Sequence, residues 1–376
     1  MPQTLVYGLP ALERVFRSRL TSHTIRTWKR YPYEPFGLTI GSGFSIDSNP
    51  QEVQPAMRDK LLGWAARCAL AVDRRRRLLV VTLHRVGPGG VSKTSEQAVE
   101  RLFRHLAKHY DLRLPAQLLD ADYRRSSAVV TVDDSYADTY EVLFPMAKRH
   151  GVPFATCVPT DFFLRGKWLW WDKLKWAVEM AAAGSQAMVE GNRVIAGDAA
   201  SEALMNQYLV YRRPQQRDAA IDEVLTKLHV ELPVSPIKKY QPVSHSDMRK
   251  MLSSGLVEIT GHSVSHPVLT ELLDEELEIE VTQTKRELEA FCNREVISFC
   301  YPNGDWNERT RMALDKAGYR IAFTTDMGVN RPHRMNLLAL RRIHGFERLG
   351  LFHALEAGLG EFKHAAGIYR LILRGS

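Results

Sequence analysis

The stretch Ala128-Val129-Val130-Thr131-Val132-Asp133-Asp134-Ser135 decides the fold class of this chain. Its first five residues are apolar or β-branched, which predicts a short buried strand. Two adjacent carboxylates follow directly, at a position where packing gives no reason for acidic side chains. We therefore expect Asp133 and Asp134 at the C-terminal end of a strand in the sheet of an α/β protein.

Strands and helices alternate on both sides of this stretch. We expect further strands at 78–84, 153–158, 256–260, 296–301, 321–324 and 338–343, and helices at 96–109, 140–150, 272–291 and 309–317. This alternation implies a parallel sheet, and so many repeats indicate a barrel with its active site at the strand C-termini. Between about 161 and 240 the alternation gives way to a helix-like, Trp-rich insertion. We expect its tryptophans to pack and anchor it to the barrel, and stacking on sugar rings is the alternative.

Two further segments supply complementary chemistry: His262-Ser263-Val264-Ser265-His266-Pro267 and Phe299-Cys300-Tyr301-Pro302-Asn303-Gly304. Pro267 disfavours a helical conformation at His266, so the two imidazoles are expected on a loop. One Asp and two His form a three-ligand site for a Zn²⁺-like ion and leave room for a water. Adjacent carboxylates repel each other without a cation, so a metal bound by Asp134 would supply that cation and leave Asp133 as base.

Together these motifs resemble the polysaccharide deacetylases that share the NodB homology domain, over roughly residues 78–346. The resemblance implies a distorted (β/α)7–8 barrel of the NodB-homology type with a helical insertion. Thr131-Val132-Asp133-Asp134-Ser135 is similar to the family motif Thr-Phe-Asp-Asp-Gly, in which the first Asp is the base and the second binds metal. His262 and His266 match the second motif and would complete the metal triad.

The resemblance also implies roles for residues around this core. The backbone N–H of Tyr301 would face the developing oxyanion. His344, which follows Leu340 with altered spacing, would be the general acid, and His84 is the alternative. The remaining expected substrate contacts are Pro302, Asn303 and Trp171, with His84 also placed among them.

Two positions depart from the family pattern. Ser135 stands where the first motif has Gly, and Cys300 stands where many members have an Arg that pairs with the base. Many bacterial exopolysaccharide-type members also lack that Arg. We therefore interpret the chain as a member of a subgroup rather than as an inactive copy.

Charge is unevenly distributed along the 376 residues. Of the net charge of +8, most falls in residues 1–77, which we interpret as a basic N-terminal extension. Residues 347–376 read as an amphipathic tail. One interpretation is that both segments contact an anionic membrane surface. The alternative is that the basic residues form a solvated face. Nucleic acid is not expected, because no binding module accompanies the charge.

Composition bounds the location and class of the protein. Four cysteines without CxxC spacing read as reduced thiols, and no secretory signal or long apolar run is recognisable. The expected location is therefore cytoplasmic, including the inner membrane face.

The expected function is metal-dependent N-deacetylation of an N-acetylated sugar in a polysaccharide, oligosaccharide or lipid-linked glycan. The expected cofactor is one divalent ion, Zn²⁺ first, with Co²⁺, Ni²⁺ and Mn²⁺ as alternatives. Hydrolysis of a formamide or cyclic amide is the second hypothesis. A carbohydrate-binding scaffold without turnover is the third, and the presence of Asp133 argues against it because binding needs only the ligands.

Overall fold

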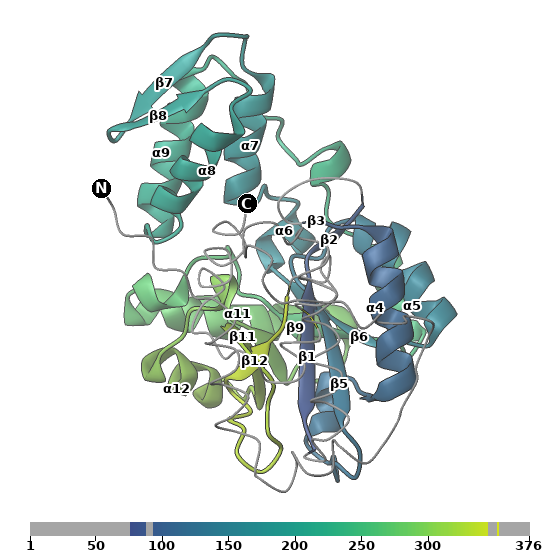
Figure 1. The fold of residues 1–376 in the computed structure, drawn as a ribbon. Coiled ribbons are helices and arrows are strands. Elements are labelled where there is room, and N and C mark those ends of the chain that lie inside the picture. The colour runs from purple at the N-terminus through teal and green to yellow at the C-terminus, as the bar shows by residue number, and fades with distance from the viewer. Residues whose placement is uncertain (1–75, 88–92, 345–351, 353–376) are drawn as a thin grey trace, which may run out of the picture. The chain divides into compact units, whose positions relative to one another are not determined.

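The computed structural model describes residues 76–87, 93–344 and Phe352 (Figure 1). All of them belong to one compact unit, Asp59–Ser376. The basic extension expected at 1–77 and the tail expected at 347–376 lie almost entirely outside the described residues. Within the described part, no helix is both long and apolar enough to cross a bilayer.

A parallel sheet forms the centre of this unit. Its strands pair in the order β1 (Leu78–Leu83), β5 (Ser127–Val132), β6 (Phe154–Val158), β9 (Val257–Gly261), β10 (Ser298–Cys300), β11 (Ile321–Met327) and β12 (Leu340–Arg342). A short strand, β4 (Asp111–Leu112), adds to the other edge of β5.

The two ends of the sheet meet. A parallel bridge joins Val81 to Ile343, with Thr82 N–H donating to Ile343 O at 3.1 Å and Ile343 N–H donating to Val80 O at 2.8 Å. The sheet is therefore nearly closed into a barrel, as the alternation of strands and helices predicts. Because all seven strands are parallel, their C-terminal ends share one rim.

Apolar side chains fill both sides of the sheet. The barrel interior contains a buried cluster that includes Cys157, Cys300 and Phe323. A larger buried cluster lies between the strands and the surrounding helices. Strands β1 and β5 are buried along their whole length because both faces are covered, and their near-continuous apolar sequence reflects that burial.

With one exception, the surrounding helices lie close to the positions that the sequence predicts. They are α4 (Glu96–His109), α5 (Phe144–His150), α10 (His245–Ser253), α11 (Asp274–Cys292) and α12 (Glu308–Lys316), and Figure 1 shows α4 and α5 beside β1 and β5. Ser95, Ser244 and Asn307 cap the N-termini of α4, α10 and α12 through their side chains. A π-helical turn, Thr139–Leu143, precedes α5. The sequence did not predict α10.

The insertion between β6 and β9 has a core of its own. It contains α6 (Thr160–Arg165), α7 (Trp170–Met180), α8 (Ala199–Leu209), α9 (Pro214–Lys227) and the hairpin β7 (Gln186–Val189) and β8 (Asn192–Ile195). Figure 1 shows α7, α8, α9 and the hairpin grouped together, apart from the barrel strands. The prediction of a purely helical insertion was incomplete: Glu190 and Gly191 both have positive φ, which suits a two-residue hairpin turn.

Two of the tryptophans form hydrogen bonds within the insertion rather than to the barrel. Trp168 Nε1 donates to Pro233 O at 2.8 Å, and Trp176 Nε1 donates to Glu231 O at 3.0 Å. Both bonds attach α7 and the chain before it to the segment that returns towards the barrel. The bonds satisfy the polar edge of each indole while its rings pack.

Candidate metal centre and active site

The residues predicted for the site follow C-terminal ends of barrel strands, except Trp171, which lies on α7. Asp133 and Asp134 follow β5, His262 and His266 follow β9, and Tyr301 follows β10. His84 and His344 lie just after β1 and β12. The parallel topology therefore brings seven residues from five separate segments to one rim of the barrel.

Asp134, His262 and His266 form a compact three-ligand cluster. Asp134 Oδ1 lies 3.6 Å from Nε2 of each histidine, and the two Nε2 atoms lie 3.1 Å apart. Ligand atoms bound to one tetrahedral Zn²⁺ lie roughly 3.4 Å from one another, so this triangle has the size that such an ion requires.

Two further observations support the fit to a cation. Asp134 Oδ1 is buried and has no hydrogen-bond partner among the described residues. Burial raises the pKa of Asp134 to about 7, with Asp133 and Asp172 adding to the rise against the opposing effect of His262. A bound cation would satisfy the orphaned oxygen and relieve the repulsion between the two carboxylates.

The tautomer of His262 also suits a ligand. Its Nδ1 lies 2.7 Å from Cys300 O, where it donates, so the lone pair of Nε2 faces the other ligands. Burial opposes a charge on His262, but Cys300, Asp133 and Asp134 together raise its pKa to about 9. A metal ion would displace the proton from Nε2. Burial and the charge of His262 hold the pKa of His266 well below its usual range.

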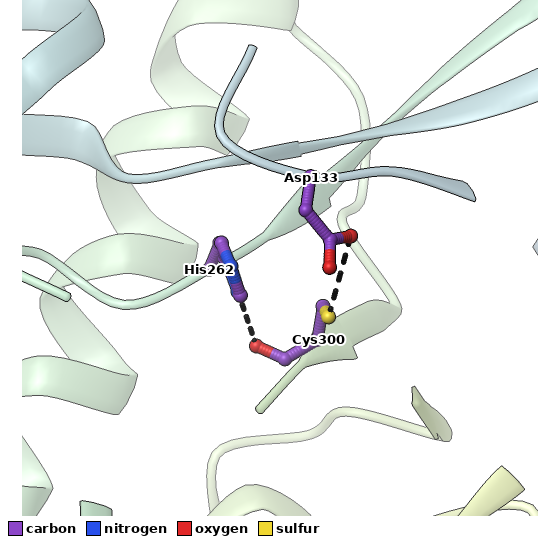
Figure 2. Close-up of side chains that lie close together, drawn as sticks. All are labelled: Asp133, His262 and Cys300. Atoms are coloured by element: carbon purple, nitrogen blue, oxygen red, sulfur yellow. Dashed lines mark hydrogen bonds between the residues drawn. The ribbon is translucent and has the colours of Figure 1, made fainter. Parts of the chain in front are cut away.

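A second group of potential ligands, Asp133, His262 and Cys300, is less suited to an ion. Figure 2 shows the Cys300 sulfur directed at Asp133 and the His262 ring directed at the Cys300 carbonyl. Nδ1 of His262 is occupied by that carbonyl. Asp133 Oδ1, the oxygen nearest the sulfur, already accepts from the Arg342 guanidinium at 2.8 Å. A cation placed there would meet an existing positive charge.

Asp133 is 2% exposed and is enclosed by polar groups. Oδ1 accepts from Arg342, while Oδ2 lies 3.5 Å from Thr82 Oγ1 and 3.6 Å from His84 Nε2. Burial would raise the pKa of Asp133, but Arg342, His84 and His262 outweigh burial and hold that pKa well below the usual range. The carboxylate is therefore ionised, as a base must be.

Arg342 is a residue of this site that the sequence reasoning missed. It is 1% exposed and alternates with the partly exposed Arg341 on β12. An arginine at the inward position of a barrel strand cannot reach solvent and needs an acidic partner. On a strand, Leu340 and Arg342 face the same side, and this position beside an inward leucine was the sequence signal for a buried Arg342.

The loops that carry the ligands have strained backbones. Asp134, Ser135, Ser263 and His266 all have positive φ, between 54° and 70°. Such conformations cost free energy for residues other than glycine and often occur at functional sites. Carboxylate oxygens of Glu280, on α11, accept from the backbone of Val264 and Ser265 at 2.6 and 3.0 Å, which fixes the loop between the histidines.

Ser135 keeps the turn that the family motif forms with Gly. Its φ of 54° is in the left-handed region that glycine adopts without strain. Hydrogen bonds of the Ser135 hydroxyl offset this strain: Oγ lies 2.6 Å from Thr156 Oγ1 and donates to Cys157 O at 3.1 Å. The tight turn is thus retained with a side chain bonded to the neighbouring strand.

The expectation for Tyr301 was wrong in one respect. Its backbone N–H donates to Phe323 O at 3.0 Å as part of the sheet, so it does not point freely at an oxyanion. Pro302 has no N–H, and the N–H of Gly304 donates to Tyr301 O at 2.8 Å. Asn303 is the remaining residue of this turn that has a backbone N–H, and its φ is 58°.

The two candidate general acids differ in access. His84 has a side chain that is 37% exposed and lies beside Asp133. His344 has a buried Nε2 without a hydrogen-bond partner among the described residues. Burial, with the charges of Arg342 and His84, lowers the pKa of His344 to about 3. The Nε2 atom of His344 is therefore enclosed, whereas the side chain of His84 is partly exposed.

Comparison with known proteins gives the site a family context. The profile of the family described as polysaccharide deacetylase matches residues 211–322, which include His262, His266 and Tyr301 but begin after Asp133 and Asp134. A putative polysaccharide deacetylase of Bacillus subtilis, YxkH, is 26% identical over 101 residues, which are 27% of this chain and 36% of that protein. The alignment thus spans about a third of that relative.

A deacetylase of known structure shares the fold. The Streptococcus pyogenes deacetylase PplD, solved with acetate, superposes with a TM-score of 0.51 at 15% identity, covering 76% of this chain and 99% of PplD. IcaB from Ammonifex degensii has a TM-score of 0.49 at 15% identity, covering 74% and 97% of the two chains. The chain is therefore similar to polysaccharide deacetylases over residues 211–322, and it shares the fold of PplD.

Proposed function

We propose that this protein is a divalent-metal-dependent N-deacetylase. Its substrate is an N-acetylated sugar in a polysaccharide, oligosaccharide or lipid-linked glycan, and its product besides the amine is acetate. One observation carries the proposal: the ionised Asp133 is adjacent to a three-ligand cluster in which Asp134 Oδ1 is buried without a hydrogen bond. A base beside a metal site is the arrangement required for attack by water on an amide.

Asp134, His262 and His266 would hold the ion, for which Zn²⁺ is our first choice because two imidazoles and one carboxylate suit it. When bound, the ion supplies a Lewis acid that polarises the acetamide carbonyl and acidifies a water. The chain contributes the ring orientation, since the Cys300 carbonyl fixes the tautomer of His262.

Asp133 accepts the proton from the attacking water. Arg342 occupies its Oδ1, which leaves Oδ2 as the oxygen that takes the proton. The backbone N–H of Asn303, in the turn after β10, then donates to the developing oxyanion. Gly304 supports that turn: a Cβ at this position would collide with Thr325.

His84 donates a proton to the leaving sugar amine, and the C–N bond breaks to release acetate. We favour His84 over His344 because a general acid must come within hydrogen-bond distance of the leaving nitrogen. The partly exposed ring of His84 allows this approach, whereas Nε2 of His344 is enclosed by protein.

Acetate release by the Zn²⁺-loaded protein from N-acetylglucosamine oligomers and from a lipid-linked N-acetylhexosamine tests the proposal. Asp133→Asn should lower kcat by about 10²-fold or more while Zn²⁺ still binds, since the ligands are intact. Asp134→Asn should lose both Zn²⁺ binding and activity. No acetate from either substrate with normal Zn²⁺ binding, or an active Asp133→Asn variant, would overturn the proposal.

A further inference from the structure

The Arg342 guanidinium lies inside the barrel, where solvent is excluded. Its Nε donates to Thr324 O at 2.7 Å, and Nη1 donates to Thr82 Oγ1 at 2.9 Å, to Thr131 Oγ1 at 3.1 Å and to Asp133 Oδ1 at 2.8 Å. These acceptors come from β11, β1 and β5. Residues of three strands therefore hold the guanidinium in place, in addition to its contact with the Asp133 carboxylate.

Burial of a guanidinium is unfavourable unless a buried anion offsets its charge. Asp133 is the one carboxylate within ion-pair distance of Arg342 among the described residues, and the two side chains are 1% and 3% exposed. The two residues thus depend on each other. Buried Arg342 requires Asp133 as an anion, and the donor that holds Asp133 is a guanidinium that does not lose its proton.

Contact with a single oxygen orients the carboxylate. Arg342 binds Oδ1, so the carboxyl plane is set and Oδ2 is directed to the side where Thr82 Oγ1 lies 3.5 Å and His84 Nε2 lies 3.6 Å away. A carboxylate without this contact could rotate about χ2, which is a soft torsion.

The strand that carries Cys300 does not supply such a cation. Its Sγ lies 3.6 Å from Asp133 Oδ1, on the same oxygen that Arg342 binds, and a thiol carries no positive charge. Cys300 on β10 and Arg342 on β12 therefore both contact Oδ1 of Asp133. Of the two, only Arg342 carries a guanidinium.

We propose that Arg342 is the positioning residue of Asp133: it holds Oδ1 so that Oδ2 faces the water, and it takes over from β12 the contact that an arginine at position 300 would make from β10. This inference rests on the proposed role of Asp133 as base.

The test compares Arg342→Lys, Arg342→Gln and the double variant Arg342→Gln/Cys300→Arg, with Arg341→Gln as the matched control on the outward face of β12. We expect Arg342→Gln to lower kcat by about 10²-fold, with KM and Zn²⁺ affinity changed by less than about threefold. Arg342→Lys should retain part of kcat, because lysine keeps the positive charge but lacks the several fixed N–H donors of the planar guanidinium. The double variant should recover about tenfold over Arg342→Gln, and Cys300→Arg alone should lose activity because two guanidinium groups would compete for Asp133.

A folded Arg342→Gln with wild-type kcat, or one whose loss lies in KM or Zn²⁺ affinity, would overturn the proposal. If Arg342→Gln does not fold, Arg342→Lys decides: wild-type kcat overturns the proposal, and a lowered kcat with unchanged KM supports it. A crystal structure of a folded variant separates this proposal from the deacetylase assignment. It should show the Asp133 carboxyl rotated from its wild-type orientation even if the wild-type protein releases no acetate.

Discussion

Trp171 packs its indole edge-on against His266, with ring centroids 4.6 Å apart and an interplanar angle of 74°. The same indole donates from Nε1 to Tyr136 Oη at 3.0 Å, and that hydroxyl donates to Asp172 Oδ2 at 2.6 Å. Arg217, on α9, also donates to His266 O at 3.4 Å. The insertion therefore contacts the candidate metal site, because it restrains His266 on two sides.

Replacing Trp171 with Ala should weaken Zn²⁺ binding by about tenfold and lower kcat, because His266 loses the ring that restricts its orientation. Trp176→Ala is the matched control, since Trp176 lies on the same helix but bonds to Glu231 O. Competition with a chromogenic chelator measures the affinity. Equal Zn²⁺ affinities for the two variants would show that the contact of Trp171 with His266 does not support the ligand.

Replacing His84 with Gln should lower kcat by about 10²-fold, as expected for the loss of a general acid. His344→Gln should change kcat by less than about fivefold, since its Nε2 is enclosed. Acetate release under saturating substrate distinguishes the two. A large loss in His344→Gln together with a small one in His84→Gln would reverse the assignment.

The sequence predicted the parts of the fold that depend on local patterns. Strands β1 and β5 and helix α4 occur where apolar runs and helical periodicity placed them, to within about one residue. The hairpin of the insertion was missed because its strands are short and its turn, Glu190-Gly191, carries only one glycine. Helix α10 was missed because its nine residues are mostly polar.

The site was predictable where a motif is contiguous and not where it depends on registry between strands. Asp134, His262 and His266 come together as expected because each follows a strand of one parallel sheet. The contact between Arg342 and Asp133 depends on barrel closure, which places β12 beside β1. The Tyr301 N–H donates to Phe323 O because the pairing of β10 with β11 extends to this residue. No local sequence pattern predicts how far that pairing extends.

Ser135 provides a test of how the strained turn is stabilised. Ser135→Ala should destabilise the protein by about 1–3 kcal/mol, because it keeps the positive φ and loses the bonds to Thr156 and Cys157. Ser135→Gly should be less destabilised than Ser135→Ala by about 1 kcal/mol, since glycine adopts this φ without strain. Denaturant unfolding measures both. A Gly variant less stable than the Ala variant would contradict the role assigned to the backbone.

Glu258, on β9, makes stability depend on pH. Burial raises its pKa to about 7, although the Ala116 N–H and the Ser298 hydroxyl bond to the carboxyl and oppose the rise. In the unfolded chain an ordinary glutamate ionises near pH 4.3. Between these two values the folded state holds a proton that the unfolded state has released, so stability falls as pH rises from about 4.3 to about 7 and then levels off.

Glu258→Gln removes this ionisation while keeping an oxygen that can accept a hydrogen bond. The variant should therefore gain stability relative to the wild type as pH increases, by an amount on the order of 1 kcal/mol between pH 4 and pH 8. Calorimetric Tm values of both proteins at pH 4, 6 and 8 measure the change. Glu295→Gln is the control, because that carboxylate is 62% exposed. A Tm difference that stays constant across the three pH values would show that Glu258 ionises alike in the folded and unfolded states.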